Sequence, residues 1–170
     1  AMIGEVEQRV QAYRELQAER RKRILSEIGA ALATTFDVND LTDILARELP
    51  QLGISRGYLS LYEDPQPYRY PQPAPEWSRL VLVYDEENPA GPSRIALEPE
   101  GRRFPSRQLV PEEILPQQGE YDLVVRALYF QDNQIGFMAL DGGQQEGAVY
   151  DMLHAQISSA LQGALLVQHV

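Results

Sequence analysis

The chain has 170 residues, of which 44% are hydrophobic, a formal net charge of −10 and no cysteine. This length fits one domain with a hydrophobic core and is too short for two ordinary domains. The lack of cysteine excludes disulfides, thiolate nucleophiles, zinc–cysteine sites and thioether-linked chromophores, and it fits a cytoplasmic protein.

The charges are distributed unevenly along the chain. Residues 1–29 carry six Lys or Arg and five Glu, a balance of +1 that leaves −11 for the remainder. Because nucleic-acid binding depends on basic surface, we expect no nucleic-acid partner for so acidic a body. No apolar run approaches the roughly 18–20 residues that span a bilayer, so we expect no membrane partner either.

The N-terminal stretch from Ile3 to about Thr34 is predicted to form a helix. Apolar residues recur at Ile3, Val6, Val10 and Tyr13 in alternating steps of three and four, and the pattern resumes at Ile24 after a charged patch. One interpretation pairs the first part with another helix and packs the second part on the domain. The other interpretation is a solvated helix end. We therefore divide the chain into a linker or signalling helix over 1–25 and a domain over 26–170.

A second helix follows from about Asp40 to Leu49. Asp37 or Asn39 can cap its start, and Pro50 and Gly53 end it.

The middle of the chain is predicted to contain strands and proline-rich loops. "RGYLSLYED" alternates, with Leu59 and Leu61 on one face and Tyr58, Ser60 and Tyr62 on the other. "WSRLVLVYD", from Trp77, is nearly all apolar and is expected to be covered on both faces. All twelve prolines lie between Pro50 and Pro116. They mark loops around one or two short strands in "RIALEPEGRRF" and a helical turn in "PSRQLVPEEILP".

The chain ends with a hairpin and a helix. "YDLVVRALYF" and "QIGFMAL" read as strands joined by "QDNQ", with Gly136 inside the second strand at a bulge or a close backbone approach. The last helix, over 149–167, carries an apolar stripe. The stripe comprises Val149, Tyr150, Leu153, Ile157, Ala160, Leu161, Ala164 and Leu165. Grouped strands between terminal helices predict an antiparallel α+β sandwich.

In this order the segments resemble a GAF domain, from about Ser26 to Val167. The resemblance rests on "DVNDLTDILARELPQLGISRGYLSLYE", on "YDLVVRALYFQDNQIGFMALDGG" and on the final helix with "LHAQISSAL". It implies an α+β fold with the terminal helices on one sheet face, and loops with a short helix that often enclose a ligand on the other. It also implies a homodimer through the terminal helices and a covalently attached output domain. The cyclic-nucleotide signature of the family has no counterpart here.

Few residues suggest chemistry, so we expect no catalytic residue, no metal and no cofactor. His154 and His169 lack partners at ligand spacing, and Ser158 and Ser159 lack a nucleophile elbow. "DGG" at 141–143 is better explained as a turn than as a phosphate site.

Five residues are predicted to contact a ligand. Tyr58, Tyr62 and Trp77 would form an aromatic pocket wall on or next to the face opposite Leu59 and Leu61, although they suit a core or dimer face equally well. Ser60 lies on the same face as the two tyrosines. Arg126 interrupts an apolar strand and needs a partner, which would be a ligand anion, an internal carboxylate or solvent at an edge. Arg102, Arg103 and Arg107 form a local basic spot that hints at an anion site.

We therefore expect a non-enzymatic, small-molecule-sensing or regulatory domain of a bacterial signalling protein, whose homodimer relays its state through the terminal helices. The first alternative is a structural dimerisation module without a ligand. The second alternative is a small enzyme on this fold.

Overall fold

The computed structural model describes residues 2–63, 68, 71–88, 91–117, 119–142 and 147–168, without the side chains of 2, 3, 167 and 168. In chain order the helices are α1 (Met2–Ala33), α2 (Val38–Glu48) and α3 (Gly147–Gln168), and the strands are β1 (Arg56–Tyr62), β2 (Trp77–Asp85), β3 (Arg102–Pro105), β4 (Leu123–Phe130) and β5 (Asn133–Asp141). Two short 3-10 helices, η1 (Leu49–Leu52) and η2 (Ser106–Gln108), complete the described elements.

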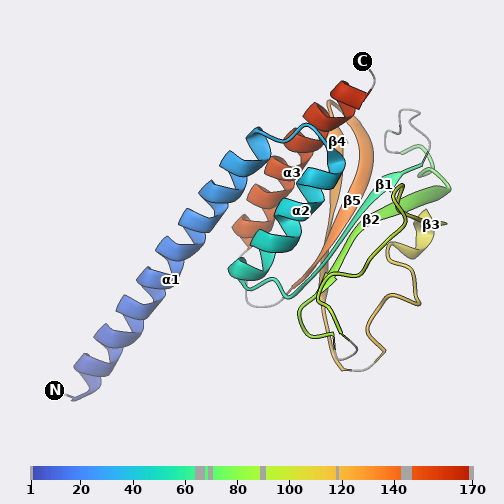
Figure 1. Cartoon of the computed structure of the whole chain (residues 1–170). Helices are drawn as coiled ribbons and strands as arrows, with labels where there is room; N and C mark the ends of the chain where they lie inside the picture. The colour runs from blue at the N-terminus through green and yellow to red at the C-terminus, as the bar shows by residue number, and fades with distance from the viewer. Residues whose placement is uncertain are drawn as a thin grey trace.

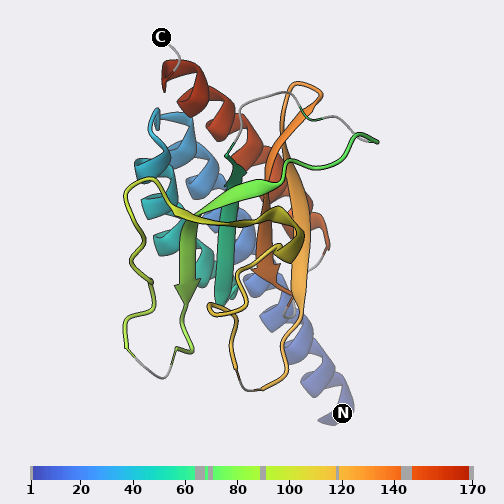
Figure 2. The same cartoon turned by 90° about the vertical axis from the view of Figure 1, so that its right-hand side faces the viewer.

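The five strands form one antiparallel sheet in the order β3-β2-β1-β5-β4. All three helices cover one face, which we call the helix face, and irregular segments cover the other, the loop face (Figures 1 and 2). The α+β arrangement predicted from the sequence is confirmed.

The chemistry of the capping residues explains where α2 begins and ends. The Asp37 carboxylate accepts a hydrogen bond from the Asn39 N–H at 2.6 Å. Of the two predicted capping residues, Asp37 and Asn39, Asp37 is therefore the N-cap. At the other end the chain continues into η1, and Gly53 stops it in a left-handed conformation with φ 85°.

The core on the helix face is a large aliphatic cluster. It includes the fully buried Leu41, Leu128 and Leu153, and it joins α1, α2 and α3 to the sheet. Most of the apolar stripe predicted on the last helix is buried here. That stripe is therefore not free to pair with a second molecule, and any dimer must use other side chains.

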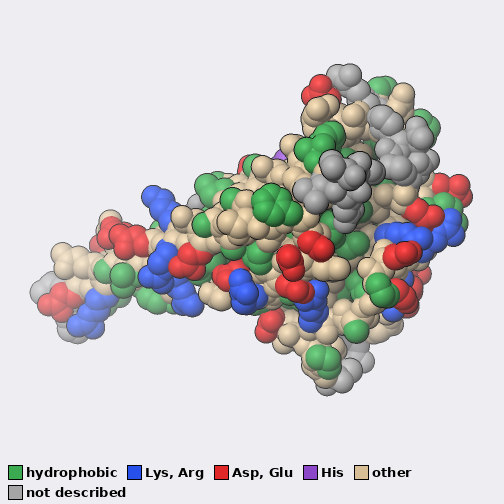
Figure 3. All heavy atoms as spheres, turned by 45° about the horizontal axis from the view of Figure 1, so that its top comes forward, with side chains coloured by type: hydrophobic (Ala, Val, Ile, Leu, Met, Phe, Trp, Pro, Cys, Tyr) green, Lys and Arg blue, Asp and Glu red, His purple; other side chains and the backbone are tan. Residues whose placement is uncertain are grey.

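The two parts of α1 differ in burial, although the helix is unbroken. Ile24, Leu25, Ile28 and Leu32 pack in the helix-face core. The preceding half projects beyond the body as an arm (Figures 1 and 3) and exposes Val6, Val10, Tyr13 and Leu16. The second part thus packs on the domain as one interpretation predicted, and what the first part contacts stays open.

The core on the loop face is smaller and more aromatic. Tyr58, Phe104 and Phe137 lie in it with Leu80, Val83, Val110 and Ala139. The predicted alternation of β1 is confirmed, because Leu59 and Leu61 pack against the helix-face core while Tyr58 and Tyr62 pack in this one.

The predicted face of Trp77 is wrong. Leu61 pairs with Arg79 in the antiparallel register, and Arg79 is two residues from Trp77 on the same strand. Since side chains alternate along a strand, Trp77 lies on the same face as Leu61. The guanidinium of Arg103 lies 3.8 Å from the Trp77 ring centroid, so this ring stacks with an arginine at the end of the sheet.

The sequence predicted a bulge or a close backbone approach at Gly136, and the structure has both. An added Cβ would lie 2.2 Å from the carbonyl oxygen of Ser60 in the neighbouring strand. The register between β4 and β5 also shifts between Leu128 and Tyr129, opposite this glycine. The turn itself is shorter than predicted, because only Gln131 and Asp132 connect the two strands.

Candidate functional site

A groove of about 480 Å³ opens on the loop face above β4 and β5, and we call it the loop-face groove. Strands supply one side of it and the segments around residues 74–76 and 105–109 supply the other. Its lining is Tyr62, Ala74, Pro75, Glu76, Pro105, Ser106, Arg107, Leu109, Val125, Ala127, Gln134 and Phe137. Such a lining, mostly apolar with a few polar groups, is typical of small-molecule sites.

Aromatic rings stiffen one wall of this groove. The Tyr62 ring lies 5.9 Å from the ring of Phe137 and 5.8 Å from that of Tyr68, and Phe137 also contacts Phe104. Gln134 Nε2 donates a hydrogen bond to the Tyr62 hydroxyl at 2.8 Å. Burial raises the pKa of Tyr62 to about 12, so its hydroxyl stays protonated to higher pH than that of an exposed tyrosine and can donate to a ligand.

The backbone is strained at the groove rim. Leu109 has φ 63° and ψ −46°, and the Val110 N–H donates to the Gln108 carbonyl oxygen at 2.7 Å. Together these define a γ-turn of the rare positive-φ kind, which costs free energy for a residue with a side chain. The Leu109 side chain is 44% exposed, so burial of this leucine does not account for the strained turn.

Arg107 differs from the other arginines of the body that the structure describes. Arg47, Arg56, Arg79, Arg94, Arg102, Arg103 and Arg126 each lie within 4 Å of a carboxylate. Arg107 lines the groove and has no ion pair among the described residues. The sequence predicted a basic spot of three arginines, but Arg102 pairs with Glu98 and Arg103 pairs with Glu63. Among the described residues, only Arg107 of the three lacks a carboxylate partner.

Of the five predicted contact residues, only Tyr62 lines the groove. Tyr58 and Ser60 are almost fully buried beside it, in the aromatic layer of the loop face. In the part of the chain that the structure describes, the Ser60 hydroxyl has no hydrogen-bond partner. Burial, and then the negative field of Asp85, raise the pKa of Tyr58 to about 12.

Arg126 and Trp77 lie away from the other three. Arg126 extends toward α3, where its Nε lies 3.4 Å from Asp151, and its side chain is 38% exposed. Its partner is thus an internal carboxylate at a solvent-facing edge, one of the alternatives that the sequence left open. Trp77 shares the helix side of the sheet, so the structure brings together Tyr58, Ser60 and Tyr62 but neither of the other two.

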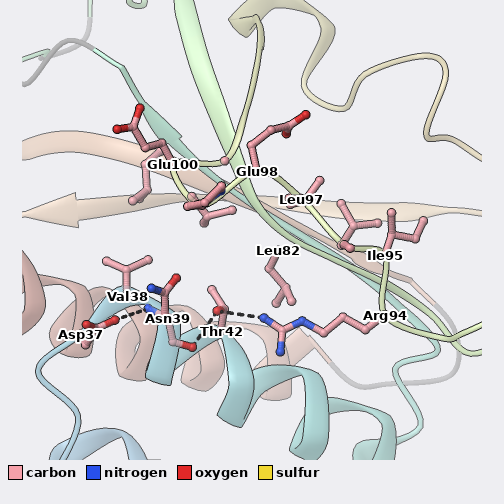
Figure 4. A pocket seen from close by; sticks show the side chains of 16 residues that line it. Asp37, Val38, Asn39, Thr42, Leu82, Arg94, Ile95, Leu97, Glu98 and Glu100 are labelled. Atoms are coloured by element: carbon pink, nitrogen blue, oxygen red, sulfur yellow. Dashed lines mark hydrogen bonds between the residues drawn. The ribbon is translucent and has the colours of Figure 1, made fainter.

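A second hollow, of about 650 Å³, lies between the start of α2 and the segment 94–101 (Figure 4). Its polar groups are engaged within the protein: Asp37 caps α2, and Arg94 pairs with Asp43 and donates to the Thr42 hydroxyl at 3.2 Å. Glu98 and Glu100 at its edge lie within 4 Å of Arg102 and Arg79. The charged groups of this cleft are therefore mostly paired within the protein, which makes it a weaker ligand site than the loop-face groove.

The remaining candidates for chemistry have structural partners. Ser158 Oγ accepts a hydrogen bond from the Tyr129 N–H at 3.3 Å, and the His154 ring contacts the Tyr129 ring edge-on. His169 and Gly143 lie outside the described residues. Among the described residues no group of three or more His, Asp or Glu is placed to hold a metal ion. No described helix is long and apolar enough to cross a membrane.

The antiparallel sheet, with helices on one face and irregular segments on the other, defines an α+β class of fold, and comparison with solved structures identifies it as GAF-like. The structure resembles the GAF domain of an Acinetobacter phosphoenolpyruvate-protein phosphotransferase, with a TM-score of 0.52 and 13% identity over 91% of this chain and 95% of that chain. It also resembles the phycocyanobilin-bound GAF domain of a cyanobacterial phytochrome, with a TM-score of 0.55 and 14% identity over 88% and 98%.

A third similar structure comprises residues 122 to 287 of a methyl-accepting chemotaxis protein. Its TM-score is 0.51, with 17% identity over 85% of this chain and 99% of that chain. No protein-family model and no curated protein sequence matches the chain. The GAF-like fold predicted from the sequence is therefore confirmed by structure.

Sequence reasoning missed most of the groove. Positive φ is expected at glycine or asparagine, so the sequence does not mark Leu109 as the site of a strained turn. Val125 and Phe137 look like ordinary strand residues. Only Tyr62, as a predicted ligand contact, and Arg107, in the predicted basic spot, pointed to this groove. The proline-rich segments supply the opposite side, and their position cannot be obtained from local patterns.

Proposed function

We propose that the chain is a non-catalytic sensory or regulatory domain of a larger bacterial signal-transduction protein, acting in the cytoplasm, and that the loop-face groove binds a small molecule. The observation that carries the proposal is the strained turn at Leu109, on the rim of an open groove with an apolar floor. Strain of this kind gathers at binding sites, where a particular backbone shape is required.

The groove favours a ligand with an apolar body and an anionic or polar group. Val125, Ala127 and Phe137 would contact the body, and Arg107 would hold an anionic group. Tyr62 and Gln134 offer hydroxyl and amide groups. One of the similar structures holds phycocyanobilin and another belongs to a chemotaxis protein. Since both share only the fold with this chain, they favour a sensory role by analogy.

A route from the groove to α3 runs through the end of β4. Ala127 lines the groove, and two residues later the backbone of Tyr129 is tied to α3 twice. Its N–H donates to Ser158 Oγ at 3.3 Å, and its carbonyl accepts from Gln162 Nε2 at 3.2 Å. A ligand that shifts β4 would move these bonds, and α3 would carry the change to an attached output domain.

We further propose a homodimer in which the projecting half of α1 pairs with its copy. Val6, Val10, Tyr13 and Leu16 are exposed there and have no cover within the described chain. Repeated apolar residues on a projecting helix are typical of helix pairing. Sedimentation should show a concentration-dependent dimer that Val10→Glu dissociates, and a strict monomer at high concentration would contradict this part.

The ligand proposal is tested with native mass spectrometry of gently purified protein and thermal shifts across a metabolite library. Val125→Trp should fill the groove, and Met152→Trp adds the same ring at an exposed position on the other side. We expect retained mass or a thermal shift in the wild type and in Met152→Trp, and neither in Val125→Trp. Bare wild-type protein without any shift would favour the ligand-free structural module instead.

An enzyme on this fold is the remaining alternative. The groove offers one carboxylate, Glu76, and the Ser106 hydroxyl, which lies 2.6 Å from that of Ser78 and is shielded by burial. No group in its lining is paired as nucleophile and base. We therefore assign binding, and no reaction, to the groove.

A further inference from the structure

A second groove, of about 500 Å³, lies where α1 leaves the body, on the opposite side of the sheet from the loop-face groove. We call it the arginine groove. Its lining is Tyr13, Arg14, Gln17, Arg20, Arg21 and Ile24 from α1, with Pro50, Gln51, Leu52 and Gly53 from the end of η1. It is the one hollow described here in which every charged lining residue is a cation.

Positive and negative side chains of α1 lie on opposite faces of the helix near this groove. Arg14, Gln17 and Arg21 are spaced by three and four residues, so they share one face of α1 with the buried Ile24. Glu15 and Glu19 are also four apart but fall on the opposite face, and neither lines the groove. The carboxylates nearest in sequence are therefore not placed to neutralise the arginines.

The arginines of the groove have no counter-charge within the described chain. Seven arginines of the body lie within 4 Å of a carboxylate, whereas no such pair is formed by Arg14, Arg20 or Arg21. Arg21 is half-buried, and its Nε donates only to the Gln17 carbonyl oxygen, at 3.4 Å. The groove therefore presents guanidinium groups that no described carboxylate neutralises within 4 Å.

We infer that the arginine groove binds a small, soluble, polyvalent phosphate. Guanidinium groups match phosphoryl oxygens in geometry and charge, and several of them around one hollow favour an anion with more than one charge. A membrane surface is the less suitable source of phosphate, because the rest of the protein is acidic and anionic lipid would repel it. This site is independent of the function proposed for the loop-face groove.

Binding would have a mechanical consequence. The groove joins the projecting half of α1 to the body at the point where burial of the helix begins. An anion held between Arg14, Arg21 and the end of η1 would link the helix to the body and fix the direction in which the arm leaves the domain. The phosphate would thus modulate the same helix that the proposed dimer uses.

The test is calorimetric titration with sodium pyrophosphate at constant ionic strength. Arg14→Gln/Arg21→Gln removes two groove charges, and Arg9→Gln/Arg23→Gln removes two charges from the same helix outside the groove. We expect the first pair to weaken binding about tenfold or more and the second about twofold or less. Helical content of both variants is checked by circular dichroism.

Two results would overturn the inference: equal weakening by the two pairs, which indicates diffuse attraction, and no binding of pyrophosphate to the wild type. Val125→Trp separates this proposal from the other one. It should abolish ligand binding in the loop-face groove and leave pyrophosphate affinity unchanged, so each proposal can fail alone. Citrate in place of pyrophosphate tests the chemistry, since equal affinity for the tricarboxylate would contradict a phosphate site.

Discussion

The two faces of the sheet are built differently from the same strands. On the helix face, three helices bury a large, continuous aliphatic cluster against the sheet. On the loop face, a smaller aromatic cluster ends at a groove with a strained turn, lined by Arg107, which has no ion pair among the described residues. We infer that the helix face supplies most of the stability, whereas the loop face tolerates backbone strain.

The largest effect should come from the helix face. Leu153→Ala removes a fully buried side chain from α3, and we expect the free energy of unfolding to fall by about 2–5 kcal/mol. Val125→Ala is the matched change on the loop face, where the side chain is 38% exposed, and should cost less than about 1 kcal/mol. Urea denaturation measures both. Equal losses would contradict the division between the faces.

A smaller loss is expected at the centre of the sheet, which both faces share. Gly136→Ala would place a Cβ 2.2 Å from the Ser60 carbonyl oxygen, and the backbone of β1 or β5 must move to accept it. We expect a loss of about 1–3 kcal/mol. Gly163→Ala in α3 meets no atom within 4 Å and should instead stabilise by roughly 0.5–1 kcal/mol. A neutral Gly136→Ala would show that the two strands can separate at no cost.

The buried tyrosines should make the loop face sensitive to high pH. Because burial raises the pKa of Tyr58 to about 12, the folded state holds the phenol proton longer than the unfolded chain, whose pKa is about 10. This contribution to stability is complete below about pH 10 and is lost as the pH rises toward 12. Tyr58→Phe should therefore flatten the fall in the urea midpoint between about pH 10 and pH 12. Tyr13→Phe, at an exposed position, should leave the slope unchanged.

Sequence patterns predicted the helix face better than the loop face, for a physical reason. The spacing of Leu153, Ile157 and Leu161 follows the helical period, and the alternation of β1 follows the pleat, so local geometry fixes which side chains turn inward. The structure of the loop face depends on the position of the proline-rich segments over the sheet. No helical or strand periodicity in the sequence predicts that position. Trp77 shows the limit, because the register that decides its face is set by pairing with a distant strand.

The turn at Leu109 gives a small expected effect but the most direct test of the difference between the two faces. Glycine adopts positive φ without steric cost, so Leu109→Gly should raise the free energy of unfolding by about 1 kcal/mol, even though it removes an apolar side chain. The gain is expected because 44% of that side chain is exposed and contributes little to the core.

The same variant should weaken binding of any ligand found for the loop-face groove, since Leu109 lines its rim. Urea denaturation and a thermal shift with that ligand check the two expectations separately. A variant that is both less stable and unchanged in binding would mean that the turn contributes to packing. It would contradict the interpretation that the loop face holds backbone strain for binding.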